Sequence, residues 1–411
     1  MTNKKVAVVG GGASGLIAAH FASEKCNVTL FEKQKKIGRK ILVTGNGRCN
    51  ISNRNILRER YHSHNNEFVD SIFNRFGPAE TERFFSSIGI PFVEEGDGKL
   101  FPASLQASII PKVFEYELVK RGVNIRIHRK IEKINIENIN SAHNRFRLIT
   151  AGFEEEIFDS VILSCGSAAF PGAGASMSGY DLAESLGHNV YEPFPAILPI
   201  NIPLKSLHTL QGIKLDCSVR VIYKDICTSS SKGELLFTSY GISGPASLNI
   251  SRDVNKHILS GMIPVISIDF FPSLNHAELG SLLENIFADK NRKLSFALLG
   301  ILKDRMPEVI LSIIGIDHDK RTGVLTENEK ELILSTLKDF RITPGKPRSF
   351  EEAVIAAGGV DVNEIYSHSM ESKLVKNLFI TGELLDIDGD SGGFNLQFAW
   401  STGAIAGMAQ W

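Results

Sequence analysis

Residues 5–15 read Lys-Val-Ala-Val-Val-Gly-Gly-Gly-Ala-Ser-Gly, an apolar run that passes directly into a glycine-rich turn. A continuous apolar run such as Lys5–Val9 is typical of a parallel strand that is buried on both faces. The turn matches the pattern G-x-G-x-x-G, in which Gly10, Gly12 and Gly15 occupy the fixed positions. Because this pattern is common by itself, its meaning depends on the residues that follow it.

The residues after the turn complete a dinucleotide-binding unit. Leu16–Ser23 is rich in Ala and Leu and predicts a helix, and Asn27–Phe31 predicts a second strand that ends at Glu32. The glycines permit the tight turn, a close approach of backbone to a pyrophosphate, and close packing of helix on strand. The N–H groups at the helix start, including Ala13 and Ser14, suit the pyrophosphate, and Glu32 suits the ribose hydroxyls. The alternative is a structural turn with a chance acidic residue.

Composition excludes several classes of protein. The 411 residues contain 45 basic and 46 acidic side chains, a net charge of -1, so there is no overall basic surplus for binding nucleic acid. The hydrophobic share of 43% and the charged share of 22% are those of globular domains and exclude dominant disorder. The length predicts two or three domains.

The cysteines and the two ends of the chain indicate the cellular compartment in which we expect the protein. The five cysteines are an odd number without a C-x-x-C pair, which argues against zinc, iron–sulfur and dithiol sites. With no secretory leader before Val6, we expect a reducing cytoplasm. The uncharged stretch Ser391–Trp411 is long enough to span a membrane, but it contains Asn395 and Gln397, so we expect a buried helix.

A late segment distinguishes FAD from NAD. Flavin enzymes of the glutathione-reductase-like fold need a late segment that holds the ribitol and directs a helix at the flavin. Leu378–Glu383 reads as an apolar strand that ends in Gly382 and Glu383, and Gly392–Gln397 opens a helix. The helix dipole would stabilise negative charge on the flavin, and the Glu383 carboxylate would bind the ribitol. The alternative is a last strand and helix that merely close the sheet.

The stretch from Gly38 to Asn50 reads as an anion-facing loop. Its glycine-flanked turn presents backbone N–H groups that can face an anion or a flavin edge. Its basic side chains bring positive charge toward the pyrophosphate, and we interpret Cys49 as a packed residue rather than a redox thiol. The alternative is a basic solvated loop. The residues concerned are Gly38, Arg39, Lys40, Thr44, Gly45, Asn46, Gly47, Arg48, Cys49 and Asn50.

At this point the chain resembles a known family, the BaiN/YhiN-like (HI0933-like) NAD(P)/FAD-dependent oxidoreductases of bacteria. The resemblance covers nearly the whole chain and rests on separated blocks, of which the second and third are the most specific. The blocks are Val8–Gly15, Lys36–Asn50, Leu236–Thr238 with Gly241–Ala246, Gly358–Val360, Met370–Lys373 and Gly382–Gly403.

The resemblance implies an α/β fold: a Rossmann-type, glutathione-reductase-like FAD-binding domain with inserted β-barrel-like and small helical subdomains. A proline-rich linker, then strand patterns, then helical periodicity agree with this order. We therefore expect the FAD domain at 1–191 and 341–411, the β-barrel-like insert at 192–274 and the helical insert at 275–340. Ser229–Gly233 reads as the tip of a hairpin in the β insert.

The resemblance also extends the set of expected FAD contacts. Ile131 lies where the family places a backbone contact to adenine, and Gly166 follows a second flavin-contacting strand. No metal is expected, because His62 and His64 lack a third ligand and read as a solvated loop. The remaining residues expected to bind FAD are Lys33, Gly393, Phe394, Asn395 and Leu396.

The resemblance implies a FAD-dependent oxidoreductase that takes hydride from NAD(P)H and reduces a C=C bond in a conjugated ring or enone. Three alternatives stay open: reduction of uridine in ribosomal RNA, which would need a basic face at Arg54, Arg58 and Arg60; oxidation of a small amine or aminoketone with release of peroxide; and a non-catalytic, flavin-stabilised binding protein. The catalytic residues are unassigned, and Thr238, Tyr240 and Ser243 are the expected substrate side, with a structural turn as the alternative.

Overall fold

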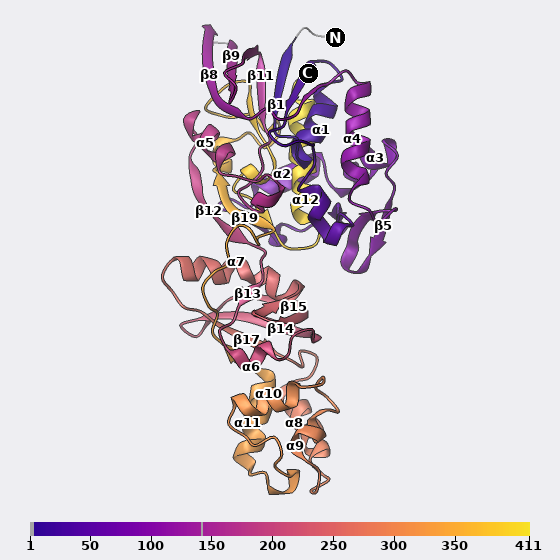
Figure 1. Cartoon of the computed structure of the whole chain (residues 1–411), viewed down its shortest axis with the longest axis vertical. Coiled ribbons are helices and arrows are strands. Elements are labelled where there is room, and N and C mark those ends of the chain that lie inside the picture. Colours follow the sequence, from indigo (N-terminus) through magenta and orange to yellow (C-terminus); the bar gives the residue numbers. More distant parts are fainter. Residues whose placement is uncertain (1–3, 141–142) are drawn as a thin grey trace. The chain divides into compact units, whose positions relative to one another are not determined.

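The computed structural model describes residues 4–140 and 143–411 and divides the chain into two compact units. One unit contains the chain up to Phe194 together with Val354–Trp411, and the other contains Pro195–Ala353. Figure 1 shows the indigo N-terminal strands and the yellow C-terminal helix in the same unit. The first unit is therefore assembled from both ends of the chain.

The first unit is built on a five-stranded parallel sheet. Its strands are ordered β20-β11-β1-β2-β7, and all four neighbouring pairs run parallel. The apolar runs seen in the sequence are these strands, because a sheet covered on both faces needs apolar side chains in both directions. The strands are β1 (Lys5–Val9), β2 (Asn27–Phe31), β7 (Asn124–Arg126), β11 (Ser160–Leu163) and β20 (Leu378–Ile380).

Two helices from opposite ends of the chain pack closely beside this sheet. Helix α1 (Ala13–Ala22) and helix α12 (Phe394–Met408) meet at glycines of α12. A Cβ atom on Gly403 would lie 2.2 Å from the Ser14 carbonyl oxygen, so no larger residue fits there. Helix α12 is buried over nearly its whole length, as expected for the uncharged C-terminal stretch. Among the described residues, no helix has the length and apolar character required to cross a membrane.

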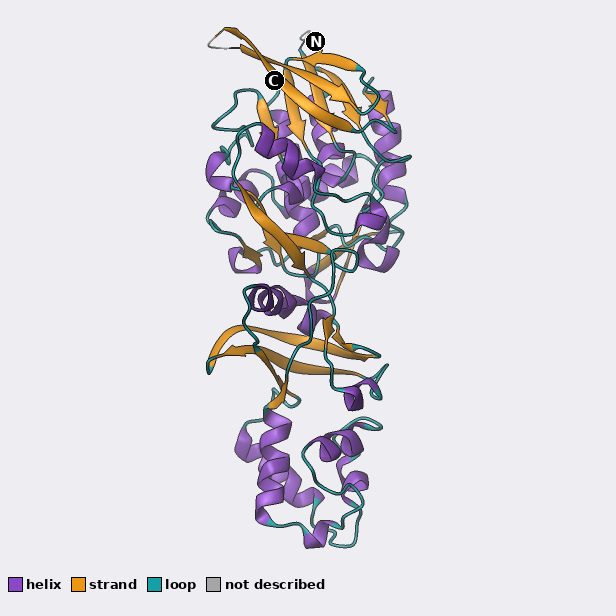
Figure 2. Ribbon diagram, turned by 60° about the vertical axis from the view of Figure 1, so that its left-hand side comes forward, coloured by secondary structure: helices purple, strands orange, loops and turns teal. Residues whose placement is uncertain are grey.

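Further helices and small sheets complete the first unit (Figure 2). Part of the core is aromatic, since the Trp400 indole of α12 stacks on Phe114, with ring centroids 5.8 Å apart. The helices are α2 (Phe68–Arg75), α3 (Pro78–Ser87), α4 (Ile109–Lys120) and α5 (Ser178–Ser185). The paired strands are β8 (Ile131–Asn140), β9 (His143–Thr150) and β10 (Glu155–Phe158); β3 (Ser52–Asn53), β6 (Lys99–Pro102) and β5 (Phe92–Glu95); β4 (Tyr61–His62) with β21 (Asp388–Gly389); and β12 (Val190–Ala196) with β19 (Ile355–Val360).

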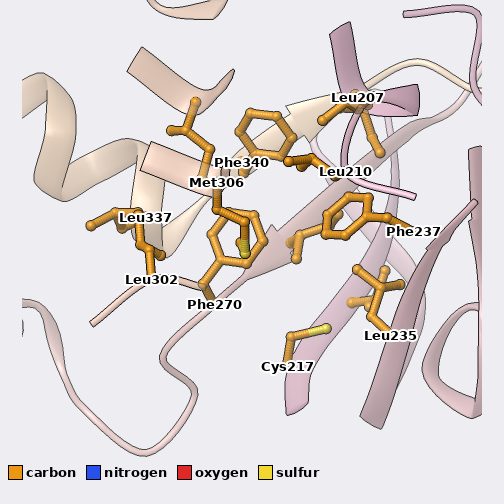
Figure 3. Close-up of a cluster of buried hydrophobic side chains, with 14 of the residues drawn as sticks. Leu207, Leu210, Cys217, Leu235, Phe237, Phe270, Leu302, Met306, Leu337 and Phe340 are labelled. Carbon is orange, nitrogen blue, oxygen red and sulfur yellow. The ribbon is translucent and has the colours of Figure 1, made fainter. Parts of the chain in front are cut away.

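The second unit combines an antiparallel sheet with helices around one hydrophobic core. Figure 3 shows Phe237 and Leu235 of the sheet in the same cluster as Met306 and Leu337 of the helices. The six strands follow the order β13-β16-β15-β14-β17-β18. They are β13 (Ile200–Asn201), β14 (Lys214–Tyr223), β15 (Ile226–Thr238), β16 (Gly241–Ser243), β17 (Val265–Asp269) and β18 (Phe340–Ile342); the helices are α6 (Lys205–His208), α7 (Pro245–Leu259), α8 (His276–Ile286), α9 (Leu294–Leu298), α10 (Met306–Ile313) and α11 (Glu327–Lys338).

Two details of the second unit differ from the sequence expectations. Strand β18 pairs with β17, so the inserted unit continues past residue 340, where the sequence suggested a return to the FAD domain. The expected hairpin tip at Ser229–Gly233 is wrong, because these residues form part of β15. The turn instead occupies Lys224 and Asp225, with φ values of 49° and 61°, which is the left-handed conformation that two-residue hairpin turns require.

Replacing Gly403 by Ala should destabilise the first unit. The added methyl group would overlap the Ser14 carbonyl, and overpacking of this kind costs about 1–3 kcal/mol. We expect the unfolding midpoint, measured by calorimetry, to fall by several degrees. Gly96→Ala is the matched control, because a Cβ there meets no atom within 4 Å. Equal midpoints for the two variants would contradict the packing argument.

Candidate cofactor site

The glycine turn after β1 is fixed at both ends and open in the middle. The Gly10 N–H donates to the Phe31 carbonyl at 2.8 Å, and a Cβ on Gly15 would lie 1.9 Å from the Gly10 oxygen. A Cβ on Gly12, in contrast, would meet no atom within 4 Å. Two glycines are therefore required by packing, while the backbone at Gly12 faces open space that a pyrophosphate could occupy.

The start of α1 offers unpaired backbone donors beside this space. Gly12 precedes the helix without a side-chain cap, and the first intrahelical bond runs from Leu16 N–H to the Gly12 oxygen at 2.9 Å. The N–H groups of Ala13, Ser14 and Gly15 come before that bond and lack intrahelical partners. The first turn holds no acidic residue, so the positive end of the helix is available to an anion.

Glu32 is oriented by the turn itself. Its Oε2 accepts a hydrogen bond from the Gly11 N–H at 2.9 Å, and its Oε1 accepts one from the Gln34 N–H at 2.7 Å. A carboxylate can accept about four hydrogen bonds, so roughly two acceptor positions remain for ribose hydroxyls. The Arg129 N–H also donates to the Glu32 carbonyl at 2.9 Å, so the chain that enters β8 at Ile131 passes beside Glu32.

The loop from Gly38 to Asn50 folds back toward α12. Gly45, Asn46 and Gly47 are consecutive left-handed residues with φ values of 55°, 55° and 80°, and they are exposed. The Asn50 Oδ1 atom is buried and has no hydrogen-bond partner within the described chain. It would lie 2.8 Å from a Cβ on Gly393, at the start of α12. This acceptor suits a ligand that carries an N–H, such as the pyrimidine ring of a flavin.

The N-terminus of α12 is held in place by side chains but remains uncapped. Gly393 is left-handed, with φ of 98°, and a Cβ there would lie 2.4 Å from the Ser52 oxygen. The Asn395 amide exchanges hydrogen bonds with the Gly389 backbone at 2.8 and 2.7 Å, so this side chain anchors the preceding segment. Phe394 is buried, and its carbonyl accepts from Tyr61 at 3.0 Å. The backbone N–H groups through Leu396 thus remain as donors.

Glu383 has protein partners as well as its expected cofactor role. Its Oε2 lies 2.6 Å from Lys40 Nζ and accepts from the Ser167 hydroxyl at 2.9 Å. The ion pair joins the basic loop to the C-terminal segment, next to the turn at Gly166. Because both charged groups are partly exposed, the pair contributes about 0–1 kcal/mol and serves mainly to position the two segments.

The other basic side chains expected near phosphate are also engaged. Arg48 pairs with Glu95 at 2.8 Å, and its guanidinium lies 4.6 Å from the Phe101 ring centroid. Arg39 donates to the Gly172 carbonyl at 3.1 Å, and Lys33 donates to the Ser176 hydroxyl at 2.5 Å. The best-placed donors for the pyrophosphate are therefore backbone groups of the glycine turn.

Neither cysteine near the site is a reactive thiolate. Burial raises the pKa of Cys49 to about 12, and burial likewise raises the pKa of Cys165 to about 12. Both thiols stay protonated near neutral pH, which favours the packing interpretation.

Two histidine–carboxylate pairs in the first unit were not predicted from the sequence. His62 and His64 are solvated in part, with side chains 36% and 56% exposed, but each meets a carboxylate: His64 Nδ1 lies 2.8 Å from Asp386 Oδ2, and His62 Nε2 lies 3.1 Å from Asp390 Oδ1. The sequence gives no local sign of these pairs, because His64 and Asp386 are 322 residues apart.

The residues expected on the substrate side lie in the second unit. Thr238 and Ser243 are at the ends of β15 and β16, and Tyr240 occupies the turn between these strands. The Tyr240 ring is covered by the Arg348 guanidinium at 3.9 Å. Their role in substrate binding stays a prediction.

Glu32→Ala should weaken FAD binding by about 10- to 100-fold. The variant loses hydrogen bonds between a charged acceptor and the ribose hydroxyls, each of which is worth about 1.5–3 kcal/mol. Titration of the flavin-free protein with FAD, followed by flavin fluorescence, measures the change. Glu132→Ala, on an exposed side chain of the same unit, is the control. Unchanged affinity in Glu32→Ala would refute the assigned role.

Comparison with known proteins identifies the family. Residues 4–409 match the family model described as HI0933-like protein Rossmann domain. The chain is 32% identical to a 3-dehydro-bile acid delta(4,6)-reductase of Clostridium scindens, over 98% of each chain. It is 30% identical to a ribosomal RNA dihydrouridine synthase of Haemophilus influenzae, over 96% of this chain and 95% of that protein.

A solved structure supports the fold assignment. The 3-ketosteroid delta1-dehydrogenase of Sterolibacterium denitrificans aligns with a TM-score of 0.53 over 98% of this chain and 99% of that one, at 12% identity. At this identity the likeness shows a shared fold. The chain belongs to the HI0933-like family, as its motifs indicated, and is an FAD-dependent oxidoreductase of the Rossmann fold.

Proposed function

We propose that the chain reduces a carbon–carbon double bond conjugated to a ketone in a small ring compound, with NAD(P)H as the source of electrons. The observation that carries the proposal is the 32% identity, over nearly both full lengths, to a reductase of unsaturated 3-keto bile acids. The open glycine turn, the oriented Glu32 carboxylate and the uncapped start of α12 supply a matching cofactor site.

Bound FAD would supply hydride transfer, and the chain would supply binding, orientation and electrostatics. The backbone at Gly12 and the start of α1 would hold the pyrophosphate, and Glu32 would hold the adenosine ribose. The start of α12 would stabilise negative charge on the flavin pyrimidine ring. Asn50 Oδ1, buried and unpartnered within the described residues, would accept from a ring N–H.

Reduction of uridine in ribosomal RNA is the second candidate, supported by the 30% identity to a dihydrouridine synthase. The chemistry is related, because the C5=C6 bond of uracil is also conjugated to a carbonyl. The charge at the expected basic face argues against it. Each of the three arginines that could form a basic face has an acidic partner: Arg54 pairs with Glu82 at 2.6 Å, Arg58 with Asp70 at 3.1 Å and Arg60 with Asp390 at 3.0 Å. Phosphates would have to displace these carboxylates.

Anaerobic half-reactions test the proposal. We expect NADH or NADPH to bleach the flavin. A 3-keto steroid with a conjugated double bond should then restore the flavin colour at least about tenfold faster than unmodified ribosomal RNA does. A tenfold difference in rate corresponds to about 1.4 kcal/mol in activation free energy. Stopped-flow absorbance measures both steps, and mass spectrometry identifies the product. Reoxidation by RNA with formation of dihydrouridine would favour the second candidate. Bleaching by an amine alone, with peroxide as product, would favour an oxidase, and no bleaching by any donor would favour a binding protein.

A further inference from the structure

The imidazole of His64 is held in one orientation by groups from two distant parts of the chain. Its Nδ1 lies 2.8 Å from Asp386 Oδ2, and its backbone N–H donates to the same oxygen at 3.0 Å. Its ring stacks on Tyr191, with centroids 3.7 Å apart and planes 16° apart. The pairing of β4 with β21 keeps the two segments together, because His62 lies opposite Asp388.

The partner carboxylate is almost completely buried. The Asp386 side chain is 1% exposed, and its second oxygen, Oδ1, has no hydrogen-bond partner among the residues that the structure describes. A buried carboxylate with a free acceptor is costly unless a cation or a donor compensates it. The His64 imidazole at Oδ2 compensates one oxygen of this carboxylate, and the buried Oδ1 lacks a donor among the described residues.

This geometry makes Nε2 the reactive atom of His64. A carboxylate at Nδ1 keeps a proton on that nitrogen, so the ring gains and loses its other proton at Nε2. The side chain is 56% exposed, and in the described part of the chain Nε2 has no hydrogen-bond partner. An acid that must be recharged from solvent during each reaction cycle needs this combination of a fixed ring and an open nitrogen.

Two other histidine–carboxylate pairs in the same unit lack that combination. The His188 side chain is 0% exposed; Glu364 binds its Nδ1 at 2.8 Å, and its Nε2 shares a hydrogen bond with the Ser372 hydroxyl at 2.9 Å. In His62 it is Nε2 itself that meets a carboxylate, at Asp390. Of these three pairs, the His64 pair has an anchored Nδ1 and an open Nε2.

The pair adjoins the segment that is expected to hold the flavin. Asp386 lies between Glu383 and Gly393, which we expect to contact the ribitol and the flavin ring. The charges of both Glu383 and Asp386 act on the hydroxyl of Tyr180. Burial raises the pKa of this hydroxyl most, and the two carboxylates raise it further. The Asp386 N–H is also fixed, since it donates to the Val360 carbonyl at 2.9 Å.

We propose that His64 is the proton donor of the reduction and that Asp386 is the residue that positions it; this rests on the proposed function. Bound reduced FAD would supply the hydride for the new C–H bond at the β-carbon of the enone, and the electron pair of the C=C bond would then give an enolate. The Nε2–H bond of the His64 imidazolium then breaks, and its proton forms the C–H bond at the α-carbon. Neutral His64 regains a proton from solvent.

The half-reactions of His64→Gln test the proton step. Reduction of the flavin by NADH or NADPH should stay within about twofold of the native rate, while reoxidation by the steroid enone should slow about 100-fold, the scale of general acid catalysis. His62→Gln is the matched control, because His62 is two residues away in the sequence and also pairs with a carboxylate; the variant should reoxidise within about threefold of the native rate. If His64→Gln reoxidises as fast as the native protein, the proton step is refuted while the proposed function stands. If the enone does not reoxidise the native protein either, both are refuted.

A second readout needs no turnover. In long-range ¹H–¹⁵N spectra of the histidine-labelled holoprotein, neutral His64 should carry its proton on Nδ1. Asp386→Ala should remove this preference, whereas His62→Gln should leave it unchanged, and retention of FAD by Asp386→Ala would show that the fold is intact. A proton on Nε2 in the native protein, or no change in a folded Asp386→Ala, would refute the positioning role.

Discussion

The close contact between the first and last helices is the constraint on which the cofactor site depends. Helices α1 and α12 can approach because Gly403 and Gly407 have no Cβ: one would lie 2.2 Å from the Ser14 oxygen and the other 2.5 Å from the Ala18 oxygen. This contact brings the segments that start at Gly12 and Gly393 into one unit. A site for a two-part ligand such as FAD can then be built from two helix starts that are distant in the sequence.

The polar groups around this contact divide into structural and available ones. The side chains of Lys40, Arg39 and Arg48 all have protein partners, so they stabilise loops and are not free to bind an anion. The available groups are backbone donors at the two helix starts, the spare acceptor positions of Glu32 and the buried Asn50 oxygen. Groups that are fixed before the ligand arrives lose little entropy on binding, which favours tight retention of a cofactor.

Local sequence patterns predicted those parts of the fold that local physics decides. The alternation of strand, glycine turn, helix and strand up to Glu32 follows from burial and from the steric needs of one turn, and the structure has each element. The hairpin turn at Lys224 and Asp225 was missed, because composition marked the serine run in β15 instead. Long-range pairs also could not be predicted from local patterns. His64 and Asp386 are 322 residues apart, and neither residue type indicates the other as its partner.

Family resemblance filled some of these gaps without explaining them. It marked Met370–Lys373 as a block, and the structure gives a reason for Ser372: its hydroxyl accepts from the Leu374 and Val375 N–H groups and shares a hydrogen bond with buried His188. It did not reveal that Arg54, Arg58 and Arg60 are neutralised by nearby acids, which bears directly on the choice of substrate.

The most direct test of the account is the flavin specificity of the folded, flavin-free protein. Calorimetric titration with FAD and with FMN compares the complete cofactor with one that lacks the adenosine and the second phosphate. We predict one FAD bound per chain and at least about 100-fold weaker binding of FMN, because FMN would lose every contact with Glu32 and one of the two phosphates at the glycine turn; 100-fold corresponds to about 2.7 kcal/mol. Equal affinity for the two flavins, or binding of neither by a folded protein, would contradict it.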